Sequence, residues 1–382
     1  MLVVLQRYAF PLYQDGPKRA PHALIRLGTQ AQSLEGSHLW AFMKNIKEWE
    51  QFFENRGISL DVIDKHLEQV TQLLESGTPI IFELEHLSLL VGIKYEFLLK
   101  MVSGSSSFYR TFSIKKRSGG SRLIEAPYPS LLSCQDWIYK NILLGQTVHA
   151  CAHGYVPGKS IFSNAKAHLN TRTLLKMDLK DFFPSVGIGW VVNFFSSLGY
   201  AKNVSYFLAA LCCNNGRLVQ GASTSPYLTN ILLRGLDERL LQLSTRYGLN
   251  YTRYADDLTF SGAYISTNFI DIIESVVTDY GLLINESKTR LLINKNKKTV
   301  TGLSVSGSRL RITRELRRSI KKDVFYIGKY GFLSHVSQMK IKDPFYMESI
   351  LGKVNFWLQA EPKNAEAMEC KRVLLSQLRN IN

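Results

Sequence analysis

Apolar side chains in the first hundred residues recur at steps of three and four, the spacing of one face of an α-helix. One series comprises Leu39, Phe42, Met43, Ile46, Trp49 and Phe53, and a second comprises Val62, Ile63, Leu67, Val70 and Leu74. The sequence S-G-T-P at 76–79 interrupts this spacing, and G-S-S-S at 104–107 is typical of a loop. We therefore predict a helical N-terminal block that ends near residue 105.

The pattern changes in the middle of the chain, where short apolar runs alternate with helical spacing. The predicted strands are residues 112–114, 122–124 and 174–178, and the predicted helix is 225–241. The first two strands flank a basic turn, and the third ends in an acid. Apolar and aromatic residues around Asp256 and Asp257 predict a hairpin with carboxylates at its tip. This alternation indicates an α+β layer rather than a helical bundle.

Residues 300–305 predict a further strand, and the segment that follows predicts a helix with two faces. Its apolar face comprises Ile312, Leu316, Ile320 and Val324. Its cationic face comprises Arg311, Arg314, Arg317, Arg318, Lys321 and Lys322. We expect the apolar face to pack inward, and the cations either to be solvated or to follow a phosphate backbone.

Composition excludes several classes of protein. A chain of 382 residues with 45% apolar and 11% aromatic residues suggests two or three structural units and excludes disorder as a whole. No uncharged apolar run reaches about 18 residues, so we expect no transmembrane helix. The first ten residues do not have the pattern of a signal peptide. Five cysteines without a CxxC pair favour a reducing cytosol.

The net charge of +16 is unevenly distributed along the chain. It is −2 over residues 1–105, +6 over 106–285 and +12 over 286–382. Concentrated positive charge has two usual partners, nucleic acid and an anionic membrane surface. A cationic C-terminal block would suit a long polyanion, although charge alone favours nucleic acid only weakly.

Three aspartates carry the candidate chemistry. Asp178 ends a predicted strand and is followed by aromatic residues, and Asp256 and Asp257 are adjacent within R-Y-A-D-D-L. Carboxylates among bulky apolar residues are costly unless a cation neutralises them. Mg²⁺ uses few protein carboxylates and completes its shell with water and phosphates. On adjacent strands, these aspartates can hold two Mg²⁺ ions about 3.5–4 Å apart, the arrangement used for in-line phosphoryl displacement.

The ordered set of motifs resembles a reverse transcriptase. The motifs are the basic hairpin at 115–122, Asp178 with its aromatics, Q-G-A-S-T-S-P at 220–226, Y-A-D-D at 254–257 and G-L-L-I-N-E-S-K-T at 281–289. The resemblance implies an α+β right-hand polymerase with an N-terminal helical extension. Its parts are the extension with the start of the fingers (1–105), fingers and palm (106–305) and a basic helical thumb (306–382).

Two short markers resemble the retron branch of this family, N-A-K-A-H at 164–168 and V-T-G at 300–302. The resemblance implies a cytoplasmic enzyme that copies part of a structured partner RNA into single-stranded DNA, primed from a guanosine 2′-hydroxyl. It also implies an effector protein and a role in anti-phage defence, with no membrane partner. The alternatives are a group II intron or stand-alone defence reverse transcriptase, and a non-catalytic RNA-binding scaffold.

The resemblance also implies a role for each site residue. Asp178, Asp256 and Asp257, with the carbonyl of Leu179, would hold two Mg²⁺ ions. Deoxynucleoside triphosphates would meet Lys115, Lys116, Arg122, Phe183 and Gln220, with Phe183 excluding a ribose 2′-hydroxyl. Nucleic acid would meet Asn164, His168 and the six cations of the predicted helix: Arg311, Arg314, Arg317, Arg318, Lys321 and Lys322.

Three other signals do not lead to a function. The sequence G-Y-V-P-G-K-S at 154–160 has three residues between its glycines, whereas a phosphate-binding loop needs four. His149, Cys151 and His153 alternate as strand ligands of zinc would, but no fourth ligand follows at a suitable spacing. No separate set of carboxylates indicates an RNase H module, and Cys212-Cys213 is best explained as two buried thiols in a helix.

Overall fold

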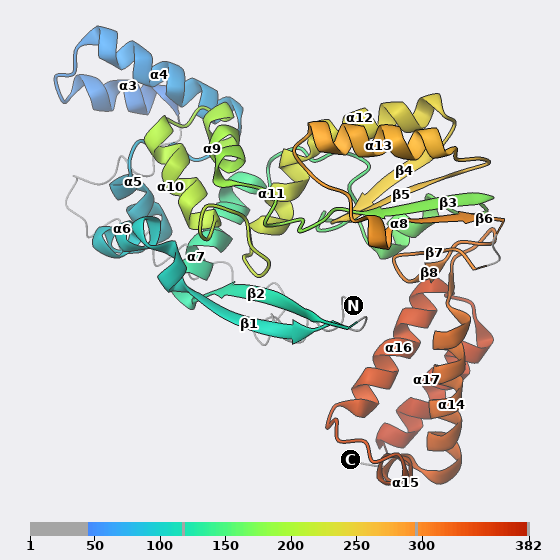
Figure 1. Cartoon of the computed structure of the whole chain (residues 1–382). Helices are drawn as coiled ribbons and strands as arrows, with labels where there is room; N and C mark the ends of the chain where they lie inside the picture. The colour runs from blue at the N-terminus through green and yellow to red at the C-terminus, as the bar shows by residue number, and fades with distance from the viewer. Residues whose placement is uncertain (1–44, 117–118, 295–296, 380–382) are drawn as a thin grey trace. The chain divides into compact units, whose positions relative to one another are not determined.

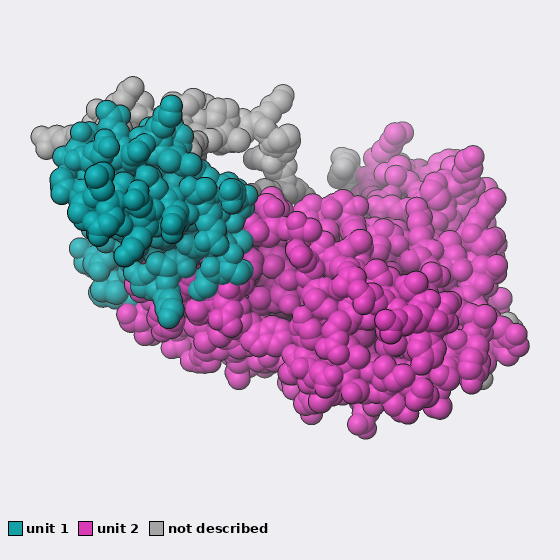
Figure 2. Space-filling model, turned by 90° about the horizontal axis from the view of Figure 1, so that it is seen from above, with its two compact units in different colours: residues 1–100, 196–204 teal, residues 101–195, 205–382 magenta. Residues whose placement is uncertain are grey.

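The computed structural model describes residues 45–116, 119–294 and 297–379. The chain forms two compact units, one comprising the described residues up to Lys100 with Ser196–Val204, and the other comprising the remainder (Figure 2). Leu39, Phe42 and Met43 of the first predicted helix lie outside the described residues, as does the N-terminal segment. The division at 105/106 and 305/306 stays a prediction.

The first unit is helical, as the spacing of its apolar residues predicts. Its helices are α3 (Ile46–Glu54), α4 (Leu60–Glu75), α5 (Leu84–Val91) and most of α6 (Tyr95–Ser103). The Asn45 side chain begins α3 by accepting a hydrogen bond from the amide of Glu48 at 2.9 Å. Trp49 and Phe53 are buried on α3, and Val70 is buried on α4. The break expected at 76–79 separates α4 from α5.

The second unit begins with a two-stranded hairpin. Its strands β1 (Tyr109–Lys115) and β2 (Ser121–Pro127) pair antiparallel, which confirms the predicted strands on either side of the basic turn. The loop expected at 104–107 is a 3₁₀ turn, η2 (Ser105–Phe108). The elements between this hairpin and the central sheet are α7 (Pro129–Ile138), the π-helical turn η3 (Tyr139–Leu143) and α8 (Ile161–Lys166).

A four-stranded antiparallel sheet forms the centre of this unit. Its strand order is β4 (Asn250–Tyr254), β5 (Asp257–Gly262), β3 (Thr173–Asp178) and β6 (Arg290–Ile293). Helices α12 (Arg234–Arg246) and α13 (Thr267–Asp279) cover one face of it (Figure 1). Leu175 and Met177 alternate along β3 and join the core beneath these helices, whereas Leu174 joins a second core on the other face. Apolar side chains therefore anchor β3 from both sides.

The predicted helix at 225–241 is wrong as a single element. It divides into α11 (Ser225–Leu232) and α12, and Leu233 between them has a non-helical backbone (φ −89°, ψ 8°). Leu233, Leu236 and Leu240 are all fully buried in the core between the sheet and the helices that cover it. Apolar periodicity continues across the break because both helices bury apolar residues, so the periodicity alone does not reveal it.

Within the described residues, the remaining helical elements are two helices and a 3₁₀ turn in the middle of the chain and four helices in the C-terminal region. They are α9 (Ile188–Ser197), α10 (Lys202–Cys212), the 3₁₀ turn η4 (Glu286–Lys288), α14 (Arg314–Tyr330), α15 (Phe332–Gln338), α16 (Tyr346–Ala360) and α17 (Ala365–Arg379). Helices α14, α16 and α17 share one core that includes Ile320, Val324 and Trp357. The inward apolar face predicted for α14 is therefore confirmed.

Two expectations for the C-terminal region are wrong. The strand predicted at 300–305 is a tight hairpin of β7 (Thr299–Val300) and β8 (Leu303–Ser304). Its turn residues Thr301 and Gly302 have positive φ angles of 45° and 83°, which reverse the chain. The helix after it begins only at α14, where Thr313 caps it, so Arg311 lies in β9 (Arg311–Ile312).

All five cysteines are free and buried, which confirms Cys212 and Cys213 as buried thiols. Of these two, only Cys212 is in a helix, because α10 ends there and Cys213 follows it. Among the described residues, no helix combines the length and the apolar character that crossing a membrane requires.

His168 fastens the segment after α8 to the sheet. Its imidazole is fully buried, with Nδ1 2.7 Å from the Ser261 hydroxyl and Nε2 2.7 Å from the Thr252 hydroxyl. Burial lowers the pKa of His168 to about 4, from an ordinary value of 6.5. The folded chain therefore keeps this side chain neutral where the unfolded chain would protonate it.

We predict that His168 destabilises the fold in acid. Above pH 6.5 both states hold a neutral imidazole, whereas between pH 6.5 and 4 only the unfolded state gains the proton. The free energy of unfolding should therefore fall over this window, by roughly 2–3 kcal/mol from His168 alone. Urea denaturation at several pH values should show a shallower decline for His168→Gln. Equal slopes for the two proteins would contradict this assignment.

Candidate active site

The three aspartates meet at one end of the central sheet. Asp178 is the last residue of β3 and lies directly opposite Asp257, the first residue of β5, in the antiparallel register. Asp256 occupies the two-residue turn that joins β4 to β5, and its carbonyl accepts a hydrogen bond from the amide of Leu179 at 2.9 Å. The predicted hairpin with carboxylates at its tip is therefore confirmed, and strand pairing brings the third acid to it.

The proximity of these acids changes their titration. Burial, and then the charges of Asp257 and Asp178, raise the pKa of Asp256 to about 6. Burial also raises the pKa of Asp257, with Asp178 adding to the effect and Lys176 and Lys288 opposing it. A site where carboxylates repel one another in this way favours the binding of a cation.

Lys288 is the cation nearest to this cluster among the described residues. Its Nζ donates to both carboxylate oxygens of Asp178, at 2.7 and 2.8 Å. The amide of Asn285 donates to the Asp178 carbonyl at 2.7 Å and its side-chain Nδ2 to Oδ1 at 3.4 Å. Residues 285–288 therefore hold Asp178 from the side of η4. The motif at 281–289 marks this segment in the sequence, but nothing in the sequence alone indicates that Lys288 meets Asp178.

The donor set fits a divalent cation by chemistry and charge. Three carboxylates converge at one strand end, and a single ammonium group at Asp178 leaves the cluster negative overall. Among the described residues, however, no group of three or more acidic, histidine or cysteine side chains already has the arrangement of a metal site. Because the Lys288 ammonium contacts both oxygens of Asp178, a cation would have to displace it.

The aromatic side chains of Tyr155, Phe182 and Phe183 form a group near the three aspartates. Phe182 is buried in the core, and Phe183 is partly buried and packs against the same core. The Phe183 ring lies 6.5 Å from that of Tyr155. Burial and the charge of Asp256 raise the pKa of Tyr155 to about 12, while Arg122 opposes them. Tyr155, Phe183 and Arg122 therefore belong to the surroundings of the acids.

The predicted triphosphate contacts lie on the basic hairpin and on the loop beside it. Lys115 and Lys116 are exposed and Arg122 is partly buried. The carbonyl of Gln220 accepts a hydrogen bond from the amide of Glu125 on β2, at 2.9 Å. The next residue, Gly221, has φ +130°, and a Cβ there would lie 2.5 Å from the Glu125 carbonyl oxygen. Glycine is therefore required where the loop meets β2.

Two predicted nucleic-acid contacts need correction. Asn164 is 1% exposed and His168 is fully buried. Their positions along α8 and just after it direct both side chains into the protein, where His168 bonds to β4 and β5. Because neither side chain reaches the surface, neither is placed to touch a polyanion, and His168 instead bonds to the sheet.

The predicted cationic stripe is divided between exposed and internally paired residues. Arg314, Arg318 and Lys322 are exposed on α14, and Arg311 is exposed on β9. Lys321 pairs with Glu366 at 2.6 Å. Arg317 is partly buried, pairs with Glu361 at 2.8 Å and lies over the Trp357 ring at 5.3 Å. Arg317 therefore joins α14 to α16 in addition to any contact with phosphate.

We predict that Asp256→Asn stabilises the metal-free protein at neutral pH. The raised pKa means that ionising Asp256 costs folding free energy, a cost present above about pH 6 and absent below 3.8. Removing the charge should raise the free energy of unfolding by about 1–3 kcal/mol at pH 7.5. Chemical denaturation in EDTA at pH 7.5 and pH 4 measures this. A variant no more stable than the parent at pH 7.5 would contradict the raised pKa of Asp256.

Comparison with protein families agrees with this geometry. Residues 114–327, more than half of the chain, match the family described as "Reverse transcriptase (RNA-dependent DNA polymerase)". The matched segment contains the basic turn and second strand of the hairpin, the four-stranded sheet and the three aspartates.

Comparison with individual proteins indicates which branch of the family the chain resembles. The chain is 33% identical over 271 residues to the retron Ec86 reverse transcriptase of Escherichia coli, covering 69% of this chain and 85% of that protein. It is 31% identical over 301 residues to the retron Ec83 reverse transcriptase of E. coli, covering 72% and 90%.

Among solved structures, apo telomerase from Candida tropicalis superposes with a TM-score of 0.41 at 12% identity, over 72% of this chain and 58% of that chain. The family match, together with the helices and strands described above, confirms the predicted α+β polymerase fold with N-terminal helices. The chain therefore belongs to the reverse transcriptase family, among the retron-type RNA-directed DNA polymerases.

Proposed function

We propose that this polymerase copies part of a structured partner RNA into single-stranded DNA, and that synthesis starts from a guanosine 2′-hydroxyl of that RNA. The observation that carries the polymerase chemistry is the register of Asp178 opposite Asp257, with Asp256 at the adjoining turn. Similarity to retron reverse transcriptases supports the proposal that the template is a structured partner RNA. The product would be a branched molecule in which DNA is joined to RNA.

Asp178, Asp256 and Asp257, with the carbonyl of Leu179, would hold two Mg²⁺ ions. When bound, these ions neutralise charge that develops on the attacking and leaving oxygens of an in-line phosphoryl displacement. Lys115, Lys116 and Arg122 would donate hydrogen bonds to the triphosphate. Phe183 would lie under the sugar and exclude a ribose 2′-hydroxyl, and Gln220 would contact the nucleotide.

The exposed cations of α14 and β9 would follow the phosphate backbone of the template–product duplex. They are Arg311, Arg314, Arg318 and Lys322, with Lys321 and Arg317 after exchange of their carboxylate partners. Such contacts are independent of base sequence, so they suit an enzyme that moves along its template.

We also propose that the protein works in the cytoplasm with an effector protein in anti-phage defence. The first block of the chain carries a charge of −2, unlike the cationic remainder. A region without a net positive charge is less suited to a polyanion than the cationic remainder and better suited to a protein. The N-terminal helices are therefore the region where we expect the effector to bind.

We predict that Asp256→Asn abolishes DNA synthesis, because amide oxygen cannot replace the charge of a carboxylate toward Mg²⁺. Primer extension by the purified variant on an RNA template should fall by a factor of about 10³ or more. Full activity would contradict the assigned site.

The priming reaction has its own test. Nucleic acid that co-purifies with the protein should change mobility after treatment with a debranching enzyme, because that enzyme cleaves the 2′–5′ linkage. A linear product would exclude 2′-hydroxyl priming and favour another bacterial reverse transcriptase, and the absence of any DNA product would favour an RNA-binding scaffold.

We predict that Lys288→Gln increases the affinity of the nucleic-acid-free protein for Mn²⁺. The substitution removes an ammonium group that competes with the metal for Asp178, and a gain of about tenfold corresponds to 1.4 kcal/mol. Electron paramagnetic resonance of free Mn²⁺ measures the affinity. Lys180→Gln is the control, since it removes an exposed cation two residues from Asp178. Equal effects of the two substitutions would show that Lys288 has no specific role.

A further inference from the structure

The turn that carries Asp256 has a backbone that needs support from outside. Ala255, its first residue, has φ +58°, the left-handed region that residues with a Cβ rarely occupy. Conformations of this kind persist only where surrounding structure holds them. The contacts around Ala255 therefore determine where the neighbouring carboxylates lie.

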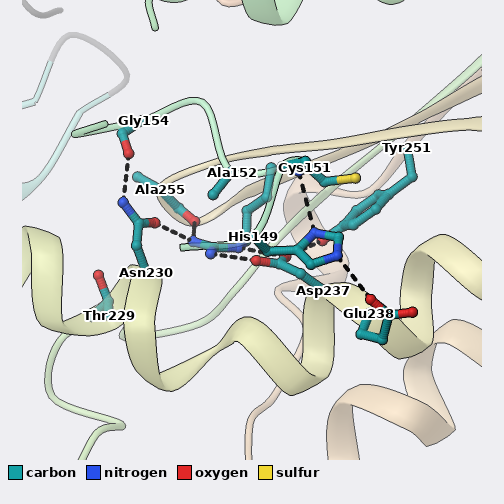
Figure 3. A network of polar contacts seen from close by, with 12 residues as sticks. His149, Cys151, Ala152, Gly154, Thr229, Asn230, Asp237, Glu238, Tyr251 and Ala255 are labelled. Carbon is teal, nitrogen blue, oxygen red and sulfur yellow. Dashed lines mark hydrogen bonds and ion pairs between the residues drawn. The ribbon is translucent and has the colours of Figure 1, made fainter. Parts of the chain in front are cut away.

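A buried ion pair lies directly beneath this turn. Arg253 and Asp237 are both fully buried, and the guanidinium donates from Nε and Nη2 to the two carboxylate oxygens at 2.8 and 2.7 Å. The Tyr251 hydroxyl donates to the same carboxylate at 2.8 Å. The third nitrogen, Nη1, donates to the carbonyl of Ala255 at 3.3 Å and to Oδ1 of Asn230 at 3.0 Å (Figure 3). The pair thus reaches from α12 to the backbone of the turn.

Asn230 extends the network to a separate loop. Its Nδ2 donates to the carbonyl of Gly154 at 2.7 Å (Figure 3). Gly154 is buried, and a Cβ at this residue would lie 2.7 Å from the amide nitrogen of Ala255. The loop and the turn are therefore in backbone contact, which only glycine at this position permits.

The loop itself is fastened to β4 by its backbone. The amide of Arg253 donates to the carbonyl of Cys151, and the amide of His153 donates to the carbonyl of Arg253, both at 2.8 Å. The Lys159 ammonium donates to the carbonyls of Ala150 and, at 2.9 Å, Ala152. The motif at 154–160 that lacks the spacing of a phosphate-binding loop is therefore joined to the catalytic hairpin.

We propose that Gly154, Asn230 and the Arg253–Asp237 pair are positioning residues for the catalytic turn. They hold the backbone of Ala255 at both of its peptide groups, with the Gly154 backbone against its amide nitrogen and the Arg253 guanidinium at its carbonyl. Asn230 joins these two contacts. Asp256 and Asp257 follow Ala255 directly, so a shift of the Ala255 backbone moves both carboxylates. This inference rests on the proposed metal site.

A purely stabilising role accounts less well for these contacts. A buried ion pair contributes little net stability compared with apolar residues of the same volume, because both charges lose their hydration. Residues that orient metal ligands typically change metal affinity or activity by 10–100-fold when they are substituted. The network should therefore affect the dependence on metal more than it affects folding.

The first test compares two glycine substitutions. Gly154→Ala places a methyl group against the turn, whereas Gly189→Ala, on α9, meets nothing within 4 Å. Gly154→Ala should lower the rate of primer extension at least tenfold and raise the Mg²⁺ concentration for half-maximal rate at least fivefold, and Gly189→Ala should change neither. An unchanged Mg²⁺ dependence in soluble, active Gly154→Ala overturns the proposal.

The second test uses neighbouring residues of one helix and does not depend on a glycine. Asn230→Leu removes the hydrogen bonds of Asn230 with the Gly154 carbonyl and with the Arg253 guanidinium. Thr229→Val removes the hydrogen bond from the buried Thr229 hydroxyl to the Pro226 carbonyl. Both should lower the temperature of unfolding, but only Asn230→Leu should weaken Mn²⁺ binding measured without nucleic acid. Arg253→Lys keeps the charge opposite Asp237 and loses the planar fork, so it should fold and show the same loss of Mn²⁺ affinity.

The outcomes separate this inference from the proposed metal site. If Asp256→Asn abolishes synthesis and Mn²⁺ binding while Asn230→Leu and Arg253→Lys bind Mn²⁺ as the parent does, the positioning role is wrong and the site stands. If Asp256→Asn leaves Mn²⁺ binding unchanged, the metal site itself is wrong. The positioning role is supported if Asn230→Leu and Arg253→Lys lose Mn²⁺ affinity and Gly154→Ala needs more Mg²⁺. The controls Thr229→Val and Gly189→Ala should bind or use the metal as the parent does.

Discussion

The burial of neighbouring carboxylates that also repel one another is the constraint on which the rest of the site depends. Antiparallel pairing sets Asp178 opposite Asp257, and the hairpin turn adds Asp256 beside them. Burial and like charge raise the pKa of Asp256 to about 6, so the folded chain holds these acids together at a cost. The sheet meets this cost with its core, since apolar residues of β3 pack on both faces.

Opposite charges and backbone contacts organise the surroundings of the acids. Lys288 contacts both oxygens of Asp178, and the buried Arg253–Asp237 pair lies under the turn. The two cations have different tasks in our proposals: Lys288 is exposed enough to leave, whereas Arg253 is fully buried and stays. Lys288 would leave Asp178 when a metal ion binds there, and Arg253 would hold the Ala255–Asp256 turn in position for that ion.

Much of the architecture can be predicted from the sequence because local patterns specify local elements. The basic hairpin, the strand before Asp178 and the acidic hairpin tip all follow from runs of apolar residues interrupted by turns. The division of 225–241 at Leu233, the turn at Thr301-Gly302 and the late start of α14 do not follow, because apolar spacing continues through each of them. The burial of His168 was also missed, since its partners Thr252 and Ser261 lie more than eighty residues away.

The sequence by itself determined the family, the order of the motifs and the concentration of positive charge toward the C-terminus, because these properties reside in residue types and their order along the chain. Only the tertiary structure decided which charges meet. Asp178 and Asp257 are neighbours through strand register, and Gly154 touches Ala255 although a hundred residues separate them. Arg253 precedes the Y-A-D-D motif and reads as one more cation of a basic protein. Burial opposite Asp237 makes it a fixed internal contact of the turn, because a charge removed from water must bond to whatever surrounds it.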